Sequence, residues 1–161
     1  MNTCPCGSNK DFGSCCQPLI NKEQQAQTPE QLMRSRYSAF ATEHYQYILD
    51  TYLGKDKQDA NKEALAEDYD GIQWLKLTVE STEMDAANSN HGFVTFSAYF
   101  GMKGKLFVLQ ERSAFEKMDG SWFYLADVSE SSNTRLKLSR NDICFCGSEK
   151  KFKKCCEHRL N

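Results

Sequence analysis

The feature that most constrains this chain is a cysteine pattern that occurs twice, once near each end. The first copy reads CPCGSNKDFGSCC over residues 4–16, and the second reads CFCGSEKKFKKCC over residues 144–156. The two copies agree at eight of thirteen positions, and together they hold all eight cysteines of the chain. Each copy therefore supplies four thiols within one short segment, which is the ligand count of a closed tetrahedral metal site.

We predict one structural metal ion at each end, because four protein ligands leave no open position for water. Two Zn²⁺ ions per chain are expected, although iron suits a tetrahedral set of thiolates as well. The glycine after the second cysteine of each copy permits a positive φ, so the backbone can turn its N–H groups toward the sulfurs. The predicted ligands are Cys4, Cys6, Cys15 and Cys16 for one ion, and Cys144, Cys146, Cys155 and Cys156 for the other.

Disulfide bonds are the alternative use of these cysteines, but adjacent cysteines bridge each other poorly. The N-terminus MNTCPCGSNK lacks the basic and apolar regions of a signal peptide. No stretch of the chain approaches the length of an apolar membrane span. These observations predict a cytoplasmic protein, and in that compartment cysteine clusters more often bind metal or act in catalysis.

The pattern C-x-C-G-S…F-x-x-C-C resembles the SEC-C motif, a metal-binding module also found at the C-terminus of the translocase motor SecA. SecA usually ends the motif with Cys-His, whereas both copies here end with Cys-Cys. The second copy has Ile143 and Phe145 where the motif usually carries prolines. The resemblance implies a protein partner, either the export chaperone SecB or the ribosome, and the departures leave the choice of partner open.

The charge of the chain is unevenly distributed. Net charge is −2 overall, but residues 135–161 hold eight basic and three acidic side chains, a net charge of +5. A basic end suits an acidic protein or a nucleic acid, although a solvated basic tail is an equally plain explanation. The side chains expected to dock a partner are Lys150, Lys151, Lys153 and Lys154.

The middle of the chain begins with helices and continues with strands. Apolar residues at three- and four-residue spacing predict one long helix over residues 28–53, and residues 61–71 suggest a second, short helix. After Gly71 the period changes to two, which predicts strands over residues 72–82, 91–101, 105–117 and 121–129. Short turn-like links favour an antiparallel meander, so we expect an α+β domain with the helices against one face of the sheet.

One strand carries polar side chains on its apolar face. On residues 105–117, Glu111 and Ser113 share the face of Phe107, Leu109 and Phe115. A carboxylate on such a face is either paired or functional. The favoured interpretation is an ion pair between Glu111 and an arginine of the long helix, and the alternative is a pocket. The residues considered for that pocket are Arg34, Arg36, Tyr37, Glu111, Ser113 and Trp122.

The segments MRSRYSAF, FVTFSAYF, LQERSAF and GSWFY resemble the YchJ family over nearly the whole chain. The resemblance implies SEC-C motifs around a middle domain with the nuclear-transport-factor-2-like (cystatin-like) fold, a curved antiparallel sheet wrapped on helices. We therefore expect an N-terminal metal module at residues 1–20, a middle domain at 21–134 and a C-terminal metal module at 135–161. That fold serves enzymes and non-enzymatic binding domains alike, so it does not decide the activity.

Three hypotheses for function follow. The leading one is a zinc-binding cytoplasmic adaptor that binds a protein and is linked to export or translation. The second is an enzyme or small-ligand binder that uses the pocket around Glu111, and the third is nucleic-acid binding through the basic C-terminal module. No catalytic Ser-His-Asp order, H-E-x-x-H motif or spare cysteine is evident, so the sequence favours a protein that is not an enzyme. It does not indicate the oligomeric state.

Overall fold

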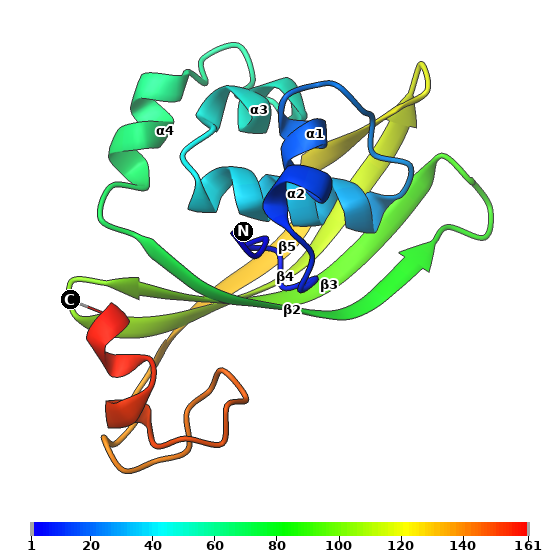
Figure 1. Ribbon diagram of the computed structural model, residues 1–161. Coiled ribbons are helices and arrows are strands. Elements are labelled where there is room, and N and C mark those ends of the chain that lie inside the picture. Colours follow the sequence, from blue (N-terminus) through cyan, green and yellow to red (C-terminus); the bar gives the residue numbers. More distant parts are fainter. Residues whose placement is uncertain (1, 161) are drawn as a thin grey trace.

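The computed structural model of the protein describes residues 2–160. Its helices lie together over one face of a curved sheet, and the C-terminal segment lies on the other side of that sheet (Figure 1). The N-terminal segment lies among the helices (Figure 1). The predicted α+β class is confirmed, and the two cysteine segments occupy opposite sides of the sheet.

The sheet has five strands in the order β1-β5-β4-β3-β2. All four predicted strands are present and pair antiparallel in sequence order. The sheet is mixed rather than purely antiparallel, because a short additional strand pairs parallel to β5 at its edge. The strands are β1 (Tyr52–Leu53), β2 (Gln73–Met84), β3 (His91–Met102), β4 (Lys105–Met118) and β5 (Ser121–Leu136). Strand β5 thus continues past residue 134, where we expected the C-terminal module to begin.

The prediction of a single helix over residues 28–53 is wrong. The structure has α2 (Pro29–Ala41), then a break, then α3 (Tyr45–Asp50), and the last predicted residues form β1 instead. At the break Glu43 has a φ of 60°. The N–H of Glu43 bonds to Phe40 O at 3.3 Å, and the N–H of His44 bonds to Ala39 O at 2.8 Å. This hydrogen-bond pattern is a Schellman ending, which usually uses glycine and here uses glutamate.

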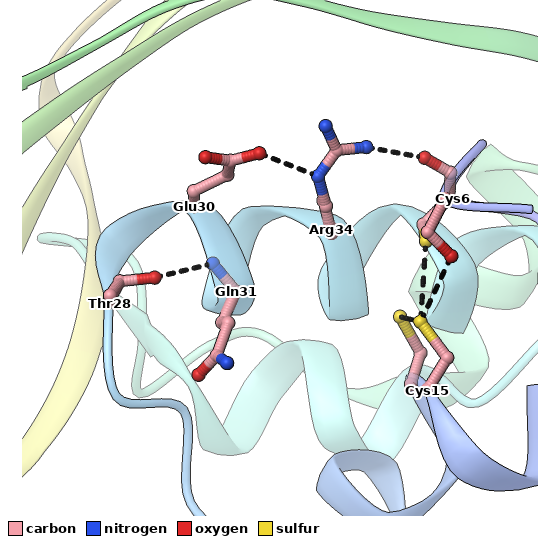
Figure 2. A network of polar contacts seen from close by, with 8 residues as sticks. Cys6, Cys15, Thr28, Glu30, Gln31 and Arg34 are labelled. Carbon is pink, nitrogen blue, oxygen red and sulfur yellow. Dashed lines mark hydrogen bonds and ion pairs between the residues drawn. The ribbon is translucent and has the colours of Figure 1, made fainter. Parts of the chain in front are cut away.

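The start of α2 is capped as its sequence predicts. The Thr28 hydroxyl accepts from the Gln31 N–H at 3.1 Å, and Figure 2 shows this bond beside the first cysteine segment. The Gln31 side chain accepts from the Gln27 N–H at 2.7 Å, whereas in a capping box it would accept from the N–H of the N-cap residue, Thr28. The other helices are α1 (Gln17–Ile20), α4 (Lys62–Asp68) and the 3₁₀ turns η1 (Phe12–Ser14), η2 (Phe152–Lys154) and η3 (Glu157–Arg159).

The main core lies between the helices and the inner face of the sheet. Val94, Ala98 and Phe115 are almost wholly buried there against α2 and α3. Beyond Leu125, residues 126–129 of β5 bulge out of register with β4. A bulge of this kind increases the local twist and bends the strand. Within residues 2–160 no helix is both long and apolar enough to cross a membrane.

Candidate metal centres

Both cysteine segments fold into the same small loop, which brings their four sulfurs together. In the first, a β-bridge pairs Thr3 with Asp11, and the N–H of Cys4 bonds to Lys10 O at 2.8 Å. The 3₁₀ turn η1 then delivers the last two cysteines. All four sulfurs of the first segment lie within 4.8 Å of one another.

The second segment repeats these contacts. Ile143 pairs with Lys151, and the N–H of Cys144 bonds to Lys150 O at 2.8 Å. The turn η2 delivers the last two cysteines, and the four sulfurs again lie within 4.8 Å. In both loops the glycine after the second cysteine has the expected positive φ, 77° at Gly7 and 83° at Gly147.

The spacing of the sulfurs fits a tetrahedral ion. Zinc–sulfur bonds of about 2.3 Å place the sulfurs of a regular tetrahedron about 3.8 Å apart. The first cluster has sulfur separations of 3.7 Å for Cys6–Cys15 and 3.9 Å for Cys15–Cys16. The second has 3.4 Å for Cys146–Cys155 and 3.8 Å for Cys155–Cys156. Each cluster can therefore hold a metal ion.

One thiol in each cluster is also prepared to ionise. In the first cluster, the hydrogen bond between Cys6 and Cys16 is the main cause that lowers the pKa of Cys6 to about 4, and burial acts in the opposite direction. Burial raises the pKa of Cys146, but hydrogen bonds with Ser148 and Cys155 outweigh it and lower the pKa to about 6. Burial raises the pKa of Cys15, Cys144 and Cys156, and the hydrogen bond to Cys6 raises the pKa of Cys16. Because the thiolate is the form that binds metal, each cluster offers one ligand that is already suited to it at neutral pH.

The first cluster is part of the main core. Cys6 is fully buried, and Cys4 and Cys16 are 3% and 2% exposed. The sulfur of Cys4 lies 3.5 Å from the Ser38 hydroxyl of α2. Figure 2 shows Arg34, also on α2, donating to Cys6 O at 2.7 Å and to Glu30 at 2.8 Å. This cluster therefore joins α2 to the N-terminal segment from inside the domain.

The second cluster forms a separate, smaller core on the outer side of the sheet. Cys144 and Cys156 pack there with Leu106, Phe152 and Leu160. Phe145, next to the first ligand, stacks on Tyr99 with ring centroids 5.0 Å apart. The Lys76 ammonium donates to Phe145 O at 3.3 Å. The module is thus attached to the sheet by contacts from β2, β3, β4 and β5, among them Leu75 and Leu136.

A cavity of about 300 Å³ lies between the helices and the sheet. Four residues considered for a pocket line it, namely Arg36, Tyr37, Glu111 and Ser113. Arg34 lies instead at the first metal cluster, and the indole N–H of Trp122 donates to Gln27 O at 3.2 Å. Within residues 2–160 no ion pair joins Glu111 to an arginine, so the favoured Glu–Arg pair is not formed. Glu111 accepts from the Ser113 hydroxyl at 2.5 Å.

Sequence reasoning missed most of the wall of this cavity. Phe40, Tyr69 and Trp74 line it from α2, from the end of α4 and from β2. Phe40 was available from the apolar stripe of the helix, and Trp74 from the alternation of its strand. Tyr69 lies at the end of a short helix, where no pattern marked it.

The four lysines expected to dock a partner lie around the second cluster. Lys150, Lys151, Lys153 and Lys154 are all exposed, and within residues 2–160 they form no ion pair. Ile143, which pairs with Lys151, is 64% exposed. The second module therefore presents four exposed lysines, one of which pairs with an exposed apolar residue.

Three comparisons with known proteins agree with this arrangement. The family model described as the YchJ middle NTF2-like domain matches residues 28–127. The SEC-C motif matches residues 2–18 and again residues 140–157. The resemblance to the YchJ family and the resemblance to the SEC-C motif are both confirmed, and the SEC-C motif matches both metal modules.

Curated relatives and solved structures match over most of the chain. A UPF0225 protein of Vibrio vulnificus is 42% identical over 96% of this chain and 98% of its own length. A UPF0225 protein of Vibrio cholerae is 39% identical over 96% and 99%. A solution structure of a SEC-C motif protein from Rhodopseudomonas palustris is 32% identical, with a TM-score of 0.70 over 82% of this chain and 98% of its own. A crystal structure of such a protein from Psychrobacter arcticus is 28% identical, with a TM-score of 0.69 over 98% and 97%.

Proposed function

This chain belongs to the YchJ family, and we propose that it is a cytoplasmic zinc-binding adaptor that docks on a protein through its C-terminal metal module. The proposal has two parts. The metal ions are structural, and the second module is the docking surface.

The chemistry of the ligands supports zinc. Soft thiolates in a tetrahedral set of four suit zinc, and sulfur separations of 3.4 to 3.9 Å match that geometry. Four thiols complete the coordination in each module, so neither ion has a position for substrate or water. When bound, zinc supplies cross-linking of a segment too short to bury a core of its own.

The four exposed lysines on the loop that also carries the exposed Ile143 are the single observation that carries the docking role. Residues 150, 151, 153 and 154 place four unpaired positive charges on a rigid, metal-clipped loop. An apolar side chain surrounded by charge is typical of a small docking site, where charge steers the encounter and the apolar group adds affinity. The first module has Thr3, Lys10, Asp11, Gly13 and Ser14 at the corresponding positions, so it lacks this surface.

The proposed partner is a protein with an acidic surface. The similarity to the SEC-C module of SecA makes the export chaperone and the ribosome the first candidates, and it links the protein to export or translation. Nucleic acid is the alternative partner, but the acidic middle domain opposes extended contact with a polyanion.

A crosslinking pulldown with the intact, metal-loaded chain tests the proposal. One variant replaces the four docking lysines with glutamine and Ile143 with serine. The control replaces four exposed lysines elsewhere with glutamine, namely Lys10, Lys55, Lys57 and Lys62. We expect export-chaperone or ribosomal proteins with the intact chain and the control, and their loss from the docking variant. Equal recovery from all three would overturn the docking role, and recovery that requires RNA would favour the nucleic-acid alternative.

A further inference from the structure

The cavity has a wall of three aromatic side chains, whose ring planes are tilted against one another by 27° to 45°. Phe40 and Tyr69 approach with ring centroids 4.6 Å apart, and Tyr69 stacks on Trp74 at 6.4 Å and 27°. All three side chains line the cavity. Its volume of about 300 Å³ lies at the small end of the range of ligand-binding pockets. An aromatic wall of this size favours a planar, ring-shaped ligand.

A buried guanidinium also lines this cavity. Arg36 is 8% exposed, and its Nη1 donates to Ile48 O at 2.7 Å and to the Thr51 hydroxyl at 2.6 Å. Its guanidinium lies 4.7 Å from the centre of the Tyr124 ring. Within residues 2–160 its Nε and Nη2 make no hydrogen bond. Because a buried charge normally uses its donors, these two nitrogens are available to a bound acceptor.

A carboxylate lines the same cavity. Glu111 accepts from the Ser113 hydroxyl and from the Tyr124 phenol, and a carboxylate has room for about four such bonds. Nearby, burial followed by the charge of Glu111 raises the pKa of Tyr124, so that phenol stays protonated. The cavity therefore offers a negatively charged hydrogen-bond acceptor, Glu111, and a positively charged donor, Arg36.

The charges decide what kind of ligand fits. An anion that approaches Arg36 meets the negative charge of Glu111, and a cation that approaches Glu111 meets Arg36. The other acidic side chain of the lining, Asp56, is exposed at the surface and is engaged by the Tyr52 hydroxyl. We propose that this cavity binds a small, neutral, planar N-heterocycle that carries an N–H donor beside a carbonyl acceptor. Its N–H donates to Glu111, its carbonyl accepts from Arg36, and its rings stack on the aromatic wall.

The lining also limits what the heterocycle can carry. Within residues 2–160, Arg36 is the one basic residue that lines the cavity. A phosphate group would therefore find no separate cation. The ligand class is a free cyclic amide of one or two fused rings, rather than a nucleotide.

Calorimetric titration of the intact, metal-loaded chain tests the inference, with Trp74 fluorescence as a second readout. The probes are quinazolin-4-one and its 3-methyl derivative, which lacks the N–H donor but keeps the carbonyl. Naphthoate and naphthamidine serve as an anion and a cation of similar size. We expect saturable binding of quinazolin-4-one, and binding at least about tenfold weaker for the other three, since each loses one charge-assisted hydrogen bond.

Two variants locate the site. Glu111→Gln removes the charged acceptor and should weaken binding of quinazolin-4-one about tenfold. The matched control is Glu80→Gln, because Glu80 makes the same 2.5 Å bond to a strand serine, Ser97, but does not line the cavity. Ala60→Phe fills the cavity at its edge and should abolish binding while the thermal midpoint stays within a few degrees of the parent.

The outcomes separate this inference from the docking role. The variant of the four docking lysines should bind quinazolin-4-one as the parent does. Absence of saturable binding to the parent, or equal effects of Glu111→Gln and Glu80→Gln, would overturn the inference. Tighter binding of naphthoate than of quinazolin-4-one would overturn it as well, and would identify an anion site at Arg36.

Discussion

The two metal modules share one cysteine frame and one loop, yet they are attached to the protein in different ways. The first is built into the main core, where three of its cysteines are at most 3% exposed beside α2. The second packs in a small cluster of its own on the outer side of the sheet, and two of its cysteines are partly exposed, against one in the first. The same metal chemistry therefore supports the core in one place and a projecting surface in the other.

The difference shows which part of a metal motif determines its role. The four ligands and the turning glycine repeat because the coordination geometry requires them. The residues between the ligands differ, and so do the elements that receive the loop. Four lysines lie between the ligands of the second module, whereas Lys10 and Asp11 are the charged residues between the ligands of the first. Loss of the ion from the N-terminal module should therefore affect the whole domain, and loss of the ion from the C-terminal module should affect only the end of the chain.

The largest expected effect follows from removing a buried ligand. Cys6→Ser should lower the metal content by one ion and the free energy of unfolding by more than about 4 kcal/mol, because the metal and the core form one unit. Chemical denaturation followed by tryptophan fluorescence measures this loss. The matched variant Cys146→Ser should also lose one ion, but with a change below about 1 kcal/mol. Equal losses of stability would contradict the comparison.

A local effect is expected when the second site is broken. In Cys146→Ser, the amide hydrogens of Cys144 and Phe152 should exchange rapidly, since their bonds to Lys150 O and Asp142 O depend on the closed loop. Amide exchange by NMR resolves these positions. Amides of β3 and β4 should keep their protection. If protection in the central strands fell as well, the second module would not be separable from the domain.

Smaller effects are expected at the contacts that attach each loop to the domain. Arg34→Met removes the 2.7 Å bond to Cys6 O and the ion pair with Glu30, and should cost about 1–2 kcal/mol. Lys76→Met removes the longer 3.3 Å bond to Phe145 O and should cost less than about 1 kcal/mol. Thermal unfolding of both variants shows which of them loses more stability. The reverse order would mean that the second module contributes more to stability than its burial indicates.

The smallest difference is expected at the two turning glycines. Alanine at either position pays about 1–2 kcal/mol for its positive φ. At Gly7 the added Cβ would also lie 3.3 Å from Leu77 O, whereas at Gly147 its nearest neighbour would be Lys76 Nζ at 3.7 Å. Gly7→Ala should therefore be the more destabilising variant by a few tenths of a kcal/mol. Equal thermal midpoints would show that the β2 backbone at Leu77 can move away from the added Cβ without a loss of stability.

Local patterns predicted the elements better than their connections. Strict alternation identified the four long strands, and the shared face of Glu111 and Leu109 was correct. The break after α2 was missed because Glu43 takes the conformation that a glycine normally marks. Strand β1 was missed because Tyr52 continues the helical spacing, and only its pairing with β5 makes it a strand.

The candidate sites divide in the same way. The ligands were readable because all four lie within thirteen residues, and the i, i+4 spacing of Glu30 and Arg34 was a signal that Arg34 had a nearer partner than Glu111. That the first cluster lies inside the core was not readable, because burial depends on contacts from α2 and β2 that are far away in the sequence. The spare donors of Arg36 likewise follow only from the folded structure.

Stepwise removal of metal by a chelator, with bound zinc and tryptophan fluorescence followed together, tests the central claim most directly. Both tryptophans, Trp74 and Trp122, lie in the middle domain. We predict two ions per chain: the ion of the C-terminal module leaves earlier, without a change in fluorescence, and the ion of the N-terminal module leaves later, as the domain unfolds. Fewer than two ions, or a change in fluorescence that accompanies the first ion lost, would contradict the account.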